Sequence, residues 1–241
     1  MKLPLIVVCT HHKTGTVWMA SIFRGIKRQF KLKLHSGLQS ALTPEHDIFL
    51  QDHSKVDFPA LRAMAAKKGR PVRAIHMIRD PRDVIISGCF YHVKTTEKWA
   101  NKPRPTLGGK SYREAISALP TDHDKLVFEM GHAGGNTIKD MLAWDYKNSD
   151  AFEARYEDLI DDTQYKFFRP MMEFAGFQGA DLEKVLEIVK QNSLFGAAQG
   201  TEHVRSGESR QWQRTFTPLL KNAFVERFPD ALQRLGYEAN W

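Results

Sequence analysis

The residues after the first apolar run have the types and spacing of an anion-binding loop. The sequence Thr-His-His-Lys-Thr-Gly-Thr, residues 10–16, follows the apolar run Leu5–Cys9 and precedes apolar residues at helical spacing from Val17 to Phe30. A strand, a glycine-containing basic loop and a helix in this order direct free backbone N–H groups and the positive end of a helix dipole toward a ligand. In a Walker A loop, by contrast, the lysine follows the second glycine, whereas Lys13 precedes Gly15. The stretch predicts a phosphate-binding loop and leaves the reaction open.

A second stretch places an arginine at the end of a predicted strand and a serine two helical turns later. It runs Arg-Asp-Pro-Arg-Asp-Val-Ile-Ile-Ser, from Arg79 to Ser87. Arginine suits bidentate phosphate binding, and a hydroxyl can add a further hydrogen bond. The alternative is that the arginines at 79 and 82 pair with the aspartates at 80 and 83 on the surface. Spacing alone leaves the two interpretations at even odds.

Alternating patterns predict the elements that would hold these residues. Apolar, β-branched runs indicate strands at 5–9, 48–50, 72–78 and 152–156, and residues 31–35 allow a further short strand. Helical spacing indicates helices at 17–30, 58–68, 81–92, 163–175, 181–191 and 218–235, and residues 111–149 are expected to be mostly helical, including a helix at 137–147. This alternation predicts an α/β domain with a central, mostly parallel sheet flanked by helices. The segments 11–16, 52–53 and 79–80 all follow predicted strands, so one shared site is expected at the carboxyl ends of the strands.

Composition narrows the class of protein. The 241 residues include 35 Lys and Arg against 28 Asp and Glu, a net charge of +7 that favours anionic ligands. No basic run is interleaved with aromatic residues, so nucleic acid is not an expected partner. Cys9 and Cys89 lie in apolar stretches and are expected to be buried free thiols in a reducing compartment. No segment has the length of a membrane span, and the N-terminal apolar run is too short for a signal peptide. We therefore expect a cytoplasmic protein.

Two further features complete the organisation. Residues 95–110 have two prolines, two glycines and no periodicity, and are interpreted as a long mobile loop that is either an insertion or a substrate lid. No internal repeat or domain boundary is evident, so residues 1–241 are predicted to form a single domain. The adjacent His11 and His12 lack the further ligand spacing of a metal site, and no metal is expected.

Together, these stretches resemble the sulfotransferases that use 3′-phosphoadenosine 5′-phosphosulfate (PAPS), especially the cytosolic branch. Residues 12–18 are similar to the family's 5′-phosphosulfate loop, usually Pro-Lys-Ser-Gly-Thr-Thr-Trp. Residues 79–87 are similar to its 3′-phosphate motif, Arg-Asn-Pro-Lys-Asp-Val-x-x-Ser. Tyr156-Glu157-Asp158 resembles the segment whose tyrosine lies by the adenine. Arg205-Ser206-Gly207, with Trp212 and Phe216, resembles the C-terminal loop of the family. The four motifs occur in the family's order and span nearly the whole chain.

The resemblance implies a P-loop-like nucleotide-binding fold and an activity. The chain would move a sulfuryl group in line from PAPS to a hydroxyl or amine and release adenosine 3′,5′-bisphosphate (PAP), without a metal. The acceptor would be a small molecule, a lipid, a glycan or a carrier-bound intermediate. Residues 195–216 would close over the nucleotide. The alternatives are a nucleotide-dependent phosphotransferase, such as a kinase, and a non-catalytic nucleotide-binding module of the same fold.

The resemblance also assigns roles to residues. Catalysis would depend on Lys13, His53 and Ser87, with Lys13 offsetting charge on the bridging oxygen and His53 acting as the general base. Asp52, His92 and Glu97 are rival bases. The residues assigned to the nucleotide are Lys13, Thr14, Gly15, Thr16, Val17, Trp18, Arg79, Ser87, Tyr156, Ser193, Leu194, Arg205, Ser206 and Gly207. The loop would cradle the 5′-phosphate, the arginines with Ser87 and Gly207 would hold the 3′-phosphate, and the aromatic residues would contact the adenine. Trp18 is nearly as well explained as a core residue of the first helix.

The sequence departs from the family pattern at specific positions. Val17 replaces a threonine, so its contact would be made by backbone only, and Gln51 stands where a sulfate-contacting lysine often lies. Ser206, Arg210 and Gln213 replace a lysine, a glycine and a lysine of the C-terminal loop. Only Thr217 survives from the family's dimerisation stretch, so that dimer is not predicted and the oligomeric state stays open.

Overall fold

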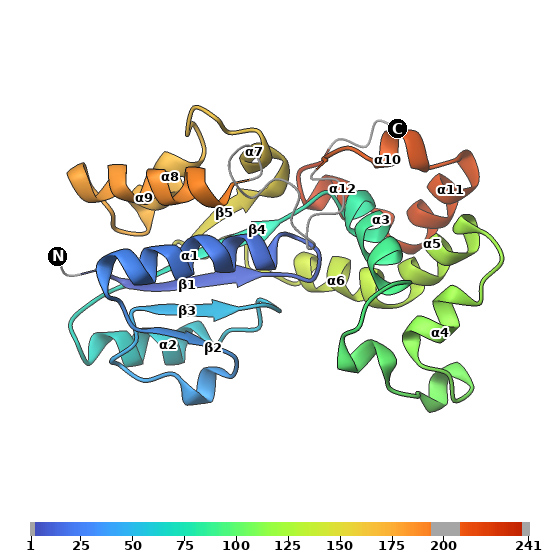
Figure 1. Ribbon diagram of the computed structural model, residues 1–241, viewed down its shortest axis with the longest axis horizontal. Coiled ribbons are helices and arrows are strands. Elements are labelled where there is room, and N and C mark those ends of the chain that lie inside the picture. The colour runs from blue at the N-terminus through green and yellow to red at the C-terminus, as the bar shows by residue number, and fades with distance from the viewer. Residues whose placement is uncertain (1–2, 194–207, 238–241) are drawn as a thin grey trace. The chain divides into compact units, whose positions relative to one another are not determined.

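The computed structural model describes residues 3–193 and 208–237, and it contains one five-stranded sheet (Figure 1). The strands are β1 (Leu5–Thr10), β2 (Leu34–Ser36), β3 (Ile48–Gln51), β4 (Val72–Ile78) and β5 (Ala151–Arg155). Their order in the sheet is β2-β3-β1-β4-β5, and every pairing is parallel. The prediction of an α/β fold with a central parallel sheet is confirmed. Because all strands run the same way, their carboxyl ends share one edge.

Contacts within the chain divide it into two compact units. Unit 1 comprises Met1–Arg79 and Trp144–Ser209, and unit 2 comprises Asp80–Ala143 and Arg210–Trp241. Unit 1 holds the sheet with α1 (Thr16–Phe30), η1 (Gln39–Ala41), α2 (Phe58–Ala66), α7 (Tyr156–Ile160), α8 (Phe168–Phe174) and α9 (Gly179–Asn192). Unit 2 holds α3 (Pro81–His92), η2 (Lys98–Asn101), η3 (Pro105–Leu107), α4 (Tyr112–Ser117), α5 (Asp122–Gly131), α6 (Ala133–Leu142), α10 (Trp212–Thr215), α11 (Pro218–Arg227) and α12 (Ala231–Arg234). In the described part of the chain, no helix is both long and apolar enough to cross a membrane.

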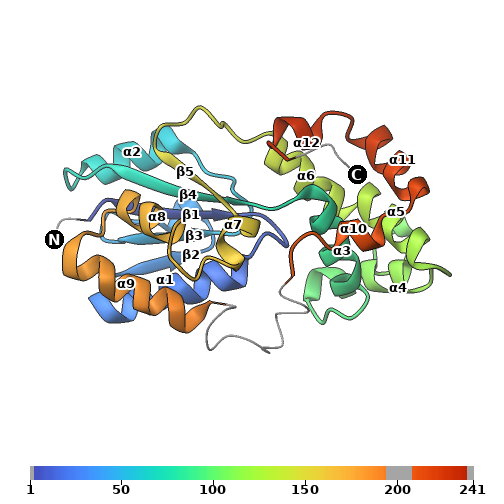
Figure 2. The same ribbon diagram turned by 90° about the horizontal axis from the view of Figure 1, so that it is seen from above.

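Helices cover both faces of the sheet in unit 1. Figure 2 shows α2 on one face and α1, α8 and α9 on the other. Alternate residues of β1 divide accordingly: Ile6 and Val8 pack in the core beneath α1, α8 and α9, while Val7 and Cys9 pack in the core beneath α2. Both cores are continuous apolar clusters, as expected for strands buried on both faces. The two cysteines are buried free thiols, as predicted.

Three helix predictions are wrong at their ends. Residues 111–149 are mostly helical, as predicted, but the helix expected at 137–147 is α6, which starts at Ala133 and ends at Leu142. Glycines at its start allow close packing, since a Cβ on Gly135 would lie 1.9 Å from the carbonyl oxygen of Met130. The helix predicted at 163–175 starts only at Phe168, because the Asp162 carboxylate accepts the N–H groups of residues 166–168 and holds a turn there. The helix predicted at 218–235 is two helices, since Pro229 interrupts the pattern between α11 and α12.

The segment 95–110 is more structured than predicted. It contains the 3₁₀ helices η2 and η3, and Pro103 forms an isolated antiparallel bridge with Ser111. Arg104 also lies over the ring of Trp99, with 5.3 Å between its guanidinium carbon and the ring centroid. The strand predicted at 152–156 ends at Arg155, so Tyr156 begins helix α7 instead.

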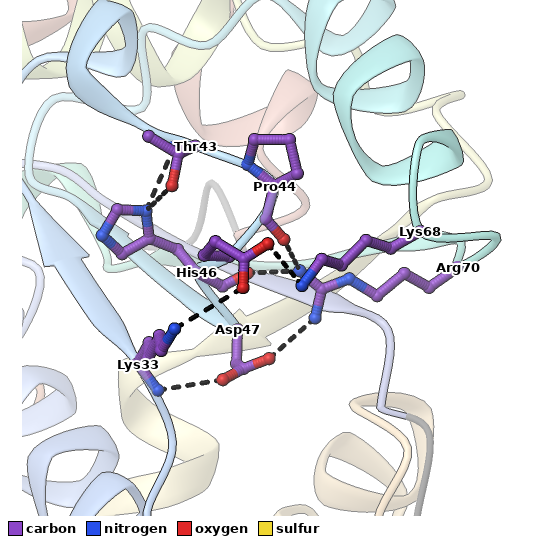
Figure 3. Close-up of polar contacts among 8 residues, drawn as sticks. Lys33, Thr43, Pro44, His46, Asp47, Lys68 and Arg70 are labelled. Carbon is purple, nitrogen blue, oxygen red and sulfur yellow. Dashed lines mark hydrogen bonds and ion pairs between the residues drawn. The ribbon is translucent and has the colours of Figure 1, made fainter.

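A polar network ties together the amino ends of three strands, at the edge opposite the predicted site (Figure 3). Asp47, just before β3, accepts a bond from the backbone N–H of Lys33 at 2.9 Å and forms a 2.8 Å ion pair with Arg70. Arg70 precedes β4, and its guanidinium also donates to the carbonyl oxygens of Pro44 and His46. Its side chain is only 7% exposed. One buried guanidinium therefore satisfies several groups that the strand starts leave unpaired.

We expect Asp47→Ala to lower the free energy of unfolding by about 2 to 3 kcal/mol. The substitution removes the carboxylate that pairs with Arg70 and leaves a largely buried positive charge without that partner. Urea unfolding followed by circular dichroism measures the change. Glu45→Ala is the matched control. The Glu45 carboxylate is exposed and pairs with Lys33 and Lys68 on the surface, so its removal should leave the free energy of unfolding unchanged within error. Equal stabilities for the two variants would contradict a structural role for the network.

Candidate functional site

The loop between β1 and α1 is closed by bonds to one backbone carbonyl. The carbonyl oxygen of His11 accepts from Thr14 N at 3.1 Å, Thr14 Oγ1 at 2.9 Å and Thr16 Oγ1 at 3.1 Å. The N–H of His11 donates to Thr14 Oγ1 at 2.9 Å, and the hydroxyl of Thr10 lies 2.8 Å from that of Thr16. At this turn, hydrogen bonds between threonine hydroxyls and the backbone thus take the place of the regular backbone hydrogen bonds of a strand or helix. The Thr16 hydroxyl proton is therefore used inside the loop.

Two residues of this loop adopt the left-handed backbone conformation. Lys13 has φ 66° and Gly15 has φ 108°. A Cβ at Gly15 would lie 2.7 Å from Met77 Cε, at the end of a flexible side chain that would have to move. The positive φ is the main reason that this position favours glycine.

The start of α1 is an electropositive helix end. Its first helical bond runs from Met19 N to Gly15 O, so the N–H groups of Thr16, Val17 and Trp18 lie in the turn that has no intrahelical acceptor. The first turn contains no acidic residue, and Val17 is exposed. Such a helix start can bind an anion, and the role of this loop in binding one stays a prediction.

Arg79 joins the loop to two other segments of unit 1. Its Nη1 donates to the carbonyl oxygen of Lys13 at 3.3 Å and its Nη2 to that of Glu208 at 3.2 Å. The guanidinium carbon lies 4.2 Å from the ring centroid of Tyr156, a cation–π contact. A buried arginine at the end of β4 thus meets the loop after β1 and the first residue after β5. Three segments distant in sequence converge at the carboxyl edge of the sheet.

Trp18 is both a core residue and a neighbour of this group. Its ring meets Tyr156 edge-on, with 5.8 Å between centroids, and Phe168 edge-on at 5.9 Å. It is buried, and its Nε1 has no hydrogen-bond partner among the described residues. The two interpretations of Trp18 are therefore compatible: one edge packs in the core and another borders Tyr156.

The neighbouring residues of the Arg79 stretch are used differently. In unit 2, Arg82 forms a bidentate pair with Asp80, at 3.0 and 2.7 Å, and its guanidinium carbon lies 3.5 Å from the ring centroid of Trp212. Asp83 Oδ1 accepts the backbone N–H of Trp212 at 3.0 Å. Asp80 also caps α3 by accepting from Arg82 N. The ion-pair interpretation thus holds for Arg82, although the pair is buried and not on the surface, while Arg79 contacts the loop. Ser87 lies half-buried in α3 of unit 2.

His53 lies on the turn after β3, which is tied to the end of β1. Ser54 Oγ donates to the carbonyl oxygen of Thr10 at 2.9 Å, and the N–H of His53 donates to Gln51 Oε1 at 3.1 Å. The imidazole is 62% exposed, with Nε2 3.9 Å from Asp52 Oδ1. Gln51 also donates to the carbonyl oxygen of Lys55 at 3.5 Å, so its amide holds the turn that carries His53. The imidazole is accessible to a substrate, as a general base must be.

The rival bases lie in other surroundings. His92 is fully buried in unit 2, and its Nδ1 lies 2.9 Å from Glu129 Oε2, which also accepts a bond from the Tyr112 hydroxyl. Glu97 is exposed in the same unit and accepts a bond from Trp99 Nε1 at 2.5 Å. His92 is therefore part of a packed core cluster, whereas His53 is on an open turn.

Of the five residues assigned to the nucleotide in the C-terminal part of the chain, the structure describes only Ser193. Ser193 is buried and donates to the carbonyl oxygen of Val189 at 2.6 Å, which caps the end of α9. Leu194, Arg205, Ser206 and Gly207 lie outside the described residues, as does most of the predicted closing loop at 195–216. Their roles stay predictions.

Sequence reasoning missed a buried histidine pair next to the loop. His11 Nε2 lies 2.8 Å from His76 Nε2, and both rings are buried. Burial, followed by the charges of His53 and Lys55, lowers the pKa of His11 to about 3. Burial, followed by the charge of His11, holds the pKa of His76 well below its usual value. The available signal was His76 itself, one of two polar residues, with Arg73, in the otherwise apolar strand Val-Arg-Ala-Ile-His-Met-Ile.

Comparisons with known proteins match the chain to one family of domains and to similar folds. The family model described as "Sulfotransferase domain" matches residues 3–236. A crystal structure of mouse sulfotransferase SULT7A1 complexed with PAP is similar at a TM-score of 0.60 and 15% identity, covering 95% of this chain and 84% of that one. Retinol dehydratase in complex with androsterone and inactive cofactor PAP is similar at a TM-score of 0.59 and 14% identity, covering 100% and 84%. No curated protein matches the chain by sequence.

We expect Gly15→Ala to destabilise the protein by about 1 to 3 kcal/mol more than Gly37→Ala, as measured by urea unfolding. Gly37 is a matched control, since its φ of 115° is similar but nothing lies within 4 Å of a Cβ there. Both variants therefore strain the backbone, and only Gly15→Ala forces Met77 to move. Equal effects would show that Met77 yields without cost.

Proposed function

Because the chain belongs to the sulfotransferase domain family, we propose that it transfers a sulfuryl group from PAPS to an acceptor hydroxyl and releases PAP. Family membership agrees with the resemblance drawn from the four motifs. The observation that carries the proposal is the convergence of three segments on Arg79: the loop of Lys13, the ring of Tyr156 and the carbonyl of Glu208. A loop for one phosphate and a buried guanidinium beside it suit a nucleotide with two separate phosphate groups.

The proposed reaction is an in-line displacement at sulfur. The acceptor oxygen forms a bond to sulfur as the bond between sulfur and the bridging oxygen breaks, and that oxygen leaves on the 5′-phosphate of the nucleotide. Lys13 offsets the negative charge that develops on the bridging oxygen, and the N–H groups of Thr16 to Trp18 hold the phosphate. The acceptor proton passes to His53. Positioning and charge stabilisation provide most of the catalysis, as in phosphoryl transfer.

The adenine and the 3′-phosphate complete the proposed donor site. Tyr156 and Trp18 would contact the base, and Arg79 with Ser87 and the loop of Arg205 would bind the 3′-phosphate. Arg79 is placed for this role because its buried guanidinium donates to the carbonyl oxygens of Lys13 and Glu208 and so lies beside the loop. The proposed acceptor class is a small alcohol, with lipid, glycan and carrier-bound hydroxyls as further members of the panel; the similar retinol dehydratase structure is a complex with androsterone and PAP.

Binding and transfer test the proposal in sequence. Isothermal titration calorimetry with PAP should give saturable binding at least about tenfold tighter than with adenosine 5′-monophosphate, because the 3′-phosphate adds charged contacts. Sulfur-35 labelled PAPS should then label at least one member of an alcohol, phenol, lipid and glycan panel. Preference for ATP with magnesium over PAP would indicate a phosphotransferase instead. PAP binding without any transfer would favour a non-catalytic module, and binding of neither nucleotide would refute the proposal.

Replacing the loop lysine should affect turnover more than binding. We expect Lys13→Ala to lower kcat about 100- to 1,000-fold while PAP affinity falls less, because charge on the bridging oxygen develops only in the transition state. Lys31→Ala is the matched control, as it removes a lysine with similar positive φ at the other end of α1. Comparable losses in both variants would assign the effect to backbone strain.

Replacing the proposed base should remove turnover and leave the nucleotide site intact. We expect His53→Ala to lower kcat about 100- to 10,000-fold and to leave PAP affinity unchanged. His123→Ala, on α5 of unit 2, controls for loss of an ordinary histidine. Retention of kcat within about threefold would exclude His53 as the base and direct attention to Glu97.

A further inference from the structure

The buried histidine pair has no part in the proposed reaction, yet it contacts the donor loop directly. The two Nε2 atoms are 2.8 Å apart and the rings meet edge-on, with 5.1 Å between centroids. The exposed fractions of the residues are 2% for His11 and 0% for His76. Two polar rings so deeply buried need a reason, because burying polar groups costs free energy unless they are paired.

The bond defines the protonation of the pair. A hydrogen bond between two imidazole nitrogens needs one N–H donor and one lone pair, so the neutral pair consists of opposite tautomers. Both Nδ1 atoms are buried and have no hydrogen-bond partner among the described residues. Within the described chain, no carboxylate lies within ion-pair distance of either ring. A proton added to the pair would therefore be a buried charge without a counterion.

His76 is held rigidly on its other side. It lies inside β4, with Cys9 of β1 and Glu153 of β5 as its register partners. Its ring stacks on Trp144, with centroids 3.9 Å apart and planes 8° apart, and meets Tyr146 edge-on at 5.7 Å. The carboxylate of Glu153 pairs with Arg155. His76 is thus an anchor on the sheet.

His11, in contrast, is the residue on which the loop closes. Its carbonyl oxygen and N–H carry the bonds to Thr14 and Thr16, which define the turn around Lys13. The Nε2 bond connects this loop residue to the sheet at its side chain, and the backbone connects it to the start of α1. A substitution at His76 would therefore affect the loop through His11.

We propose that His76 is a positioning residue for the donor: through its bond to His11, it fixes the loop conformation that presents Lys13 and the N–H groups of α1 to the 5′-phosphosulfate. This inference rests on the proposed function. The charged groups that act on the pair are His53 and Lys55, from the segment after β3, and their charges, like burial, lower the pKa of His11. The same edge of the sheet therefore keeps the pair neutral.

Two substitutions at His76 distinguish the contribution of the aromatic ring from that of the hydrogen bond made by Nε2. His76→Phe keeps an aromatic ring against Trp144 and removes the bond, whereas His76→Gln can place an amide nitrogen near the position of Nε2. We expect the dissociation constant for PAP to rise about tenfold in His76→Phe and to recover at least partly in His76→Gln, because one buried hydrogen bond is lost and restored. His46→Phe is the control, since His46 also contacts a histidine ring, that of His35 at 5.2 Å, away from the loop.

A double-mutant cycle tests whether the two histidines act through each other. His11→Phe and the double variant His11→Phe/His76→Phe should each raise the dissociation constant about tenfold, with no further increase in the double variant. Additive losses would overturn the inference. If His76→Phe fails to fold, the comparison of His76→Gln with His11→Phe in the same cycle replaces it.

Hydrogen exchange gives a readout that does not require the nucleotide. The amide of Thr14, which donates to His11 O, should exchange faster in His76→Phe than in the wild type and should regain protection in His76→Gln. Wild-type protein that fails to bind PAP would refute the proposed function. Wild-type protein that binds PAP, together with unchanged affinity and Thr14 protection in His76→Phe, would overturn only the role of His76.

Discussion

The carbonyl oxygen of His11 is the point on which the site depends. It accepts bonds from the Thr14 backbone, the Thr14 hydroxyl and the Thr16 hydroxyl, and so turns the chain from the end of β1 into α1 within five residues. The turn is tight enough to force left-handed conformations at Lys13 and Gly15. Glycine removes the steric cost at one of them, whereas Lys13 carries it. A strained charged residue at a loop tip is typical of a functional position rather than of a packing position.

Two arginines three residues apart illustrate what the sequence could not distinguish. Arg79 and Arg82 occur in the same stretch with the same choice of aspartates, and local spacing left the ion-pair and ligand interpretations equal. The difference is tertiary. Trp212, more than a hundred residues away, stacks on Arg82 and bonds to Asp83, while the loop and Tyr156 occupy Arg79. A pattern within nine residues contains none of that information.

Elements buried on both sides were predictable, and elements shaped by single contacts were not. The strand Val72–Ile78 and the helix Pro81–His92 match their predictions at both ends, since a continuous apolar run and a proline at the first helical position mark them locally. The early start of α6 depends on how closely Gly135 approaches Met130, and the late start of α8 depends on the carboxylate of Asp162. His76 was missed for the same reason: its partner is sixty-five residues away, and only the sheet brings them together.

Gln51 shows how a departure from a family motif acquires a physical meaning. The resemblance places Gln51 where the family often has a lysine. In this chain the glutamine amide accepts the N–H of His53 and donates to the carbonyl of Lys55, so it stabilises the turn that carries His53. The positive charge is not lost from that edge, because Lys55 lies close enough to lower the pKa of His11. At this position the chain therefore has a glutamine that holds the turn of His53 in place of a charged lysine, and a lysine, Lys55, follows four residues later.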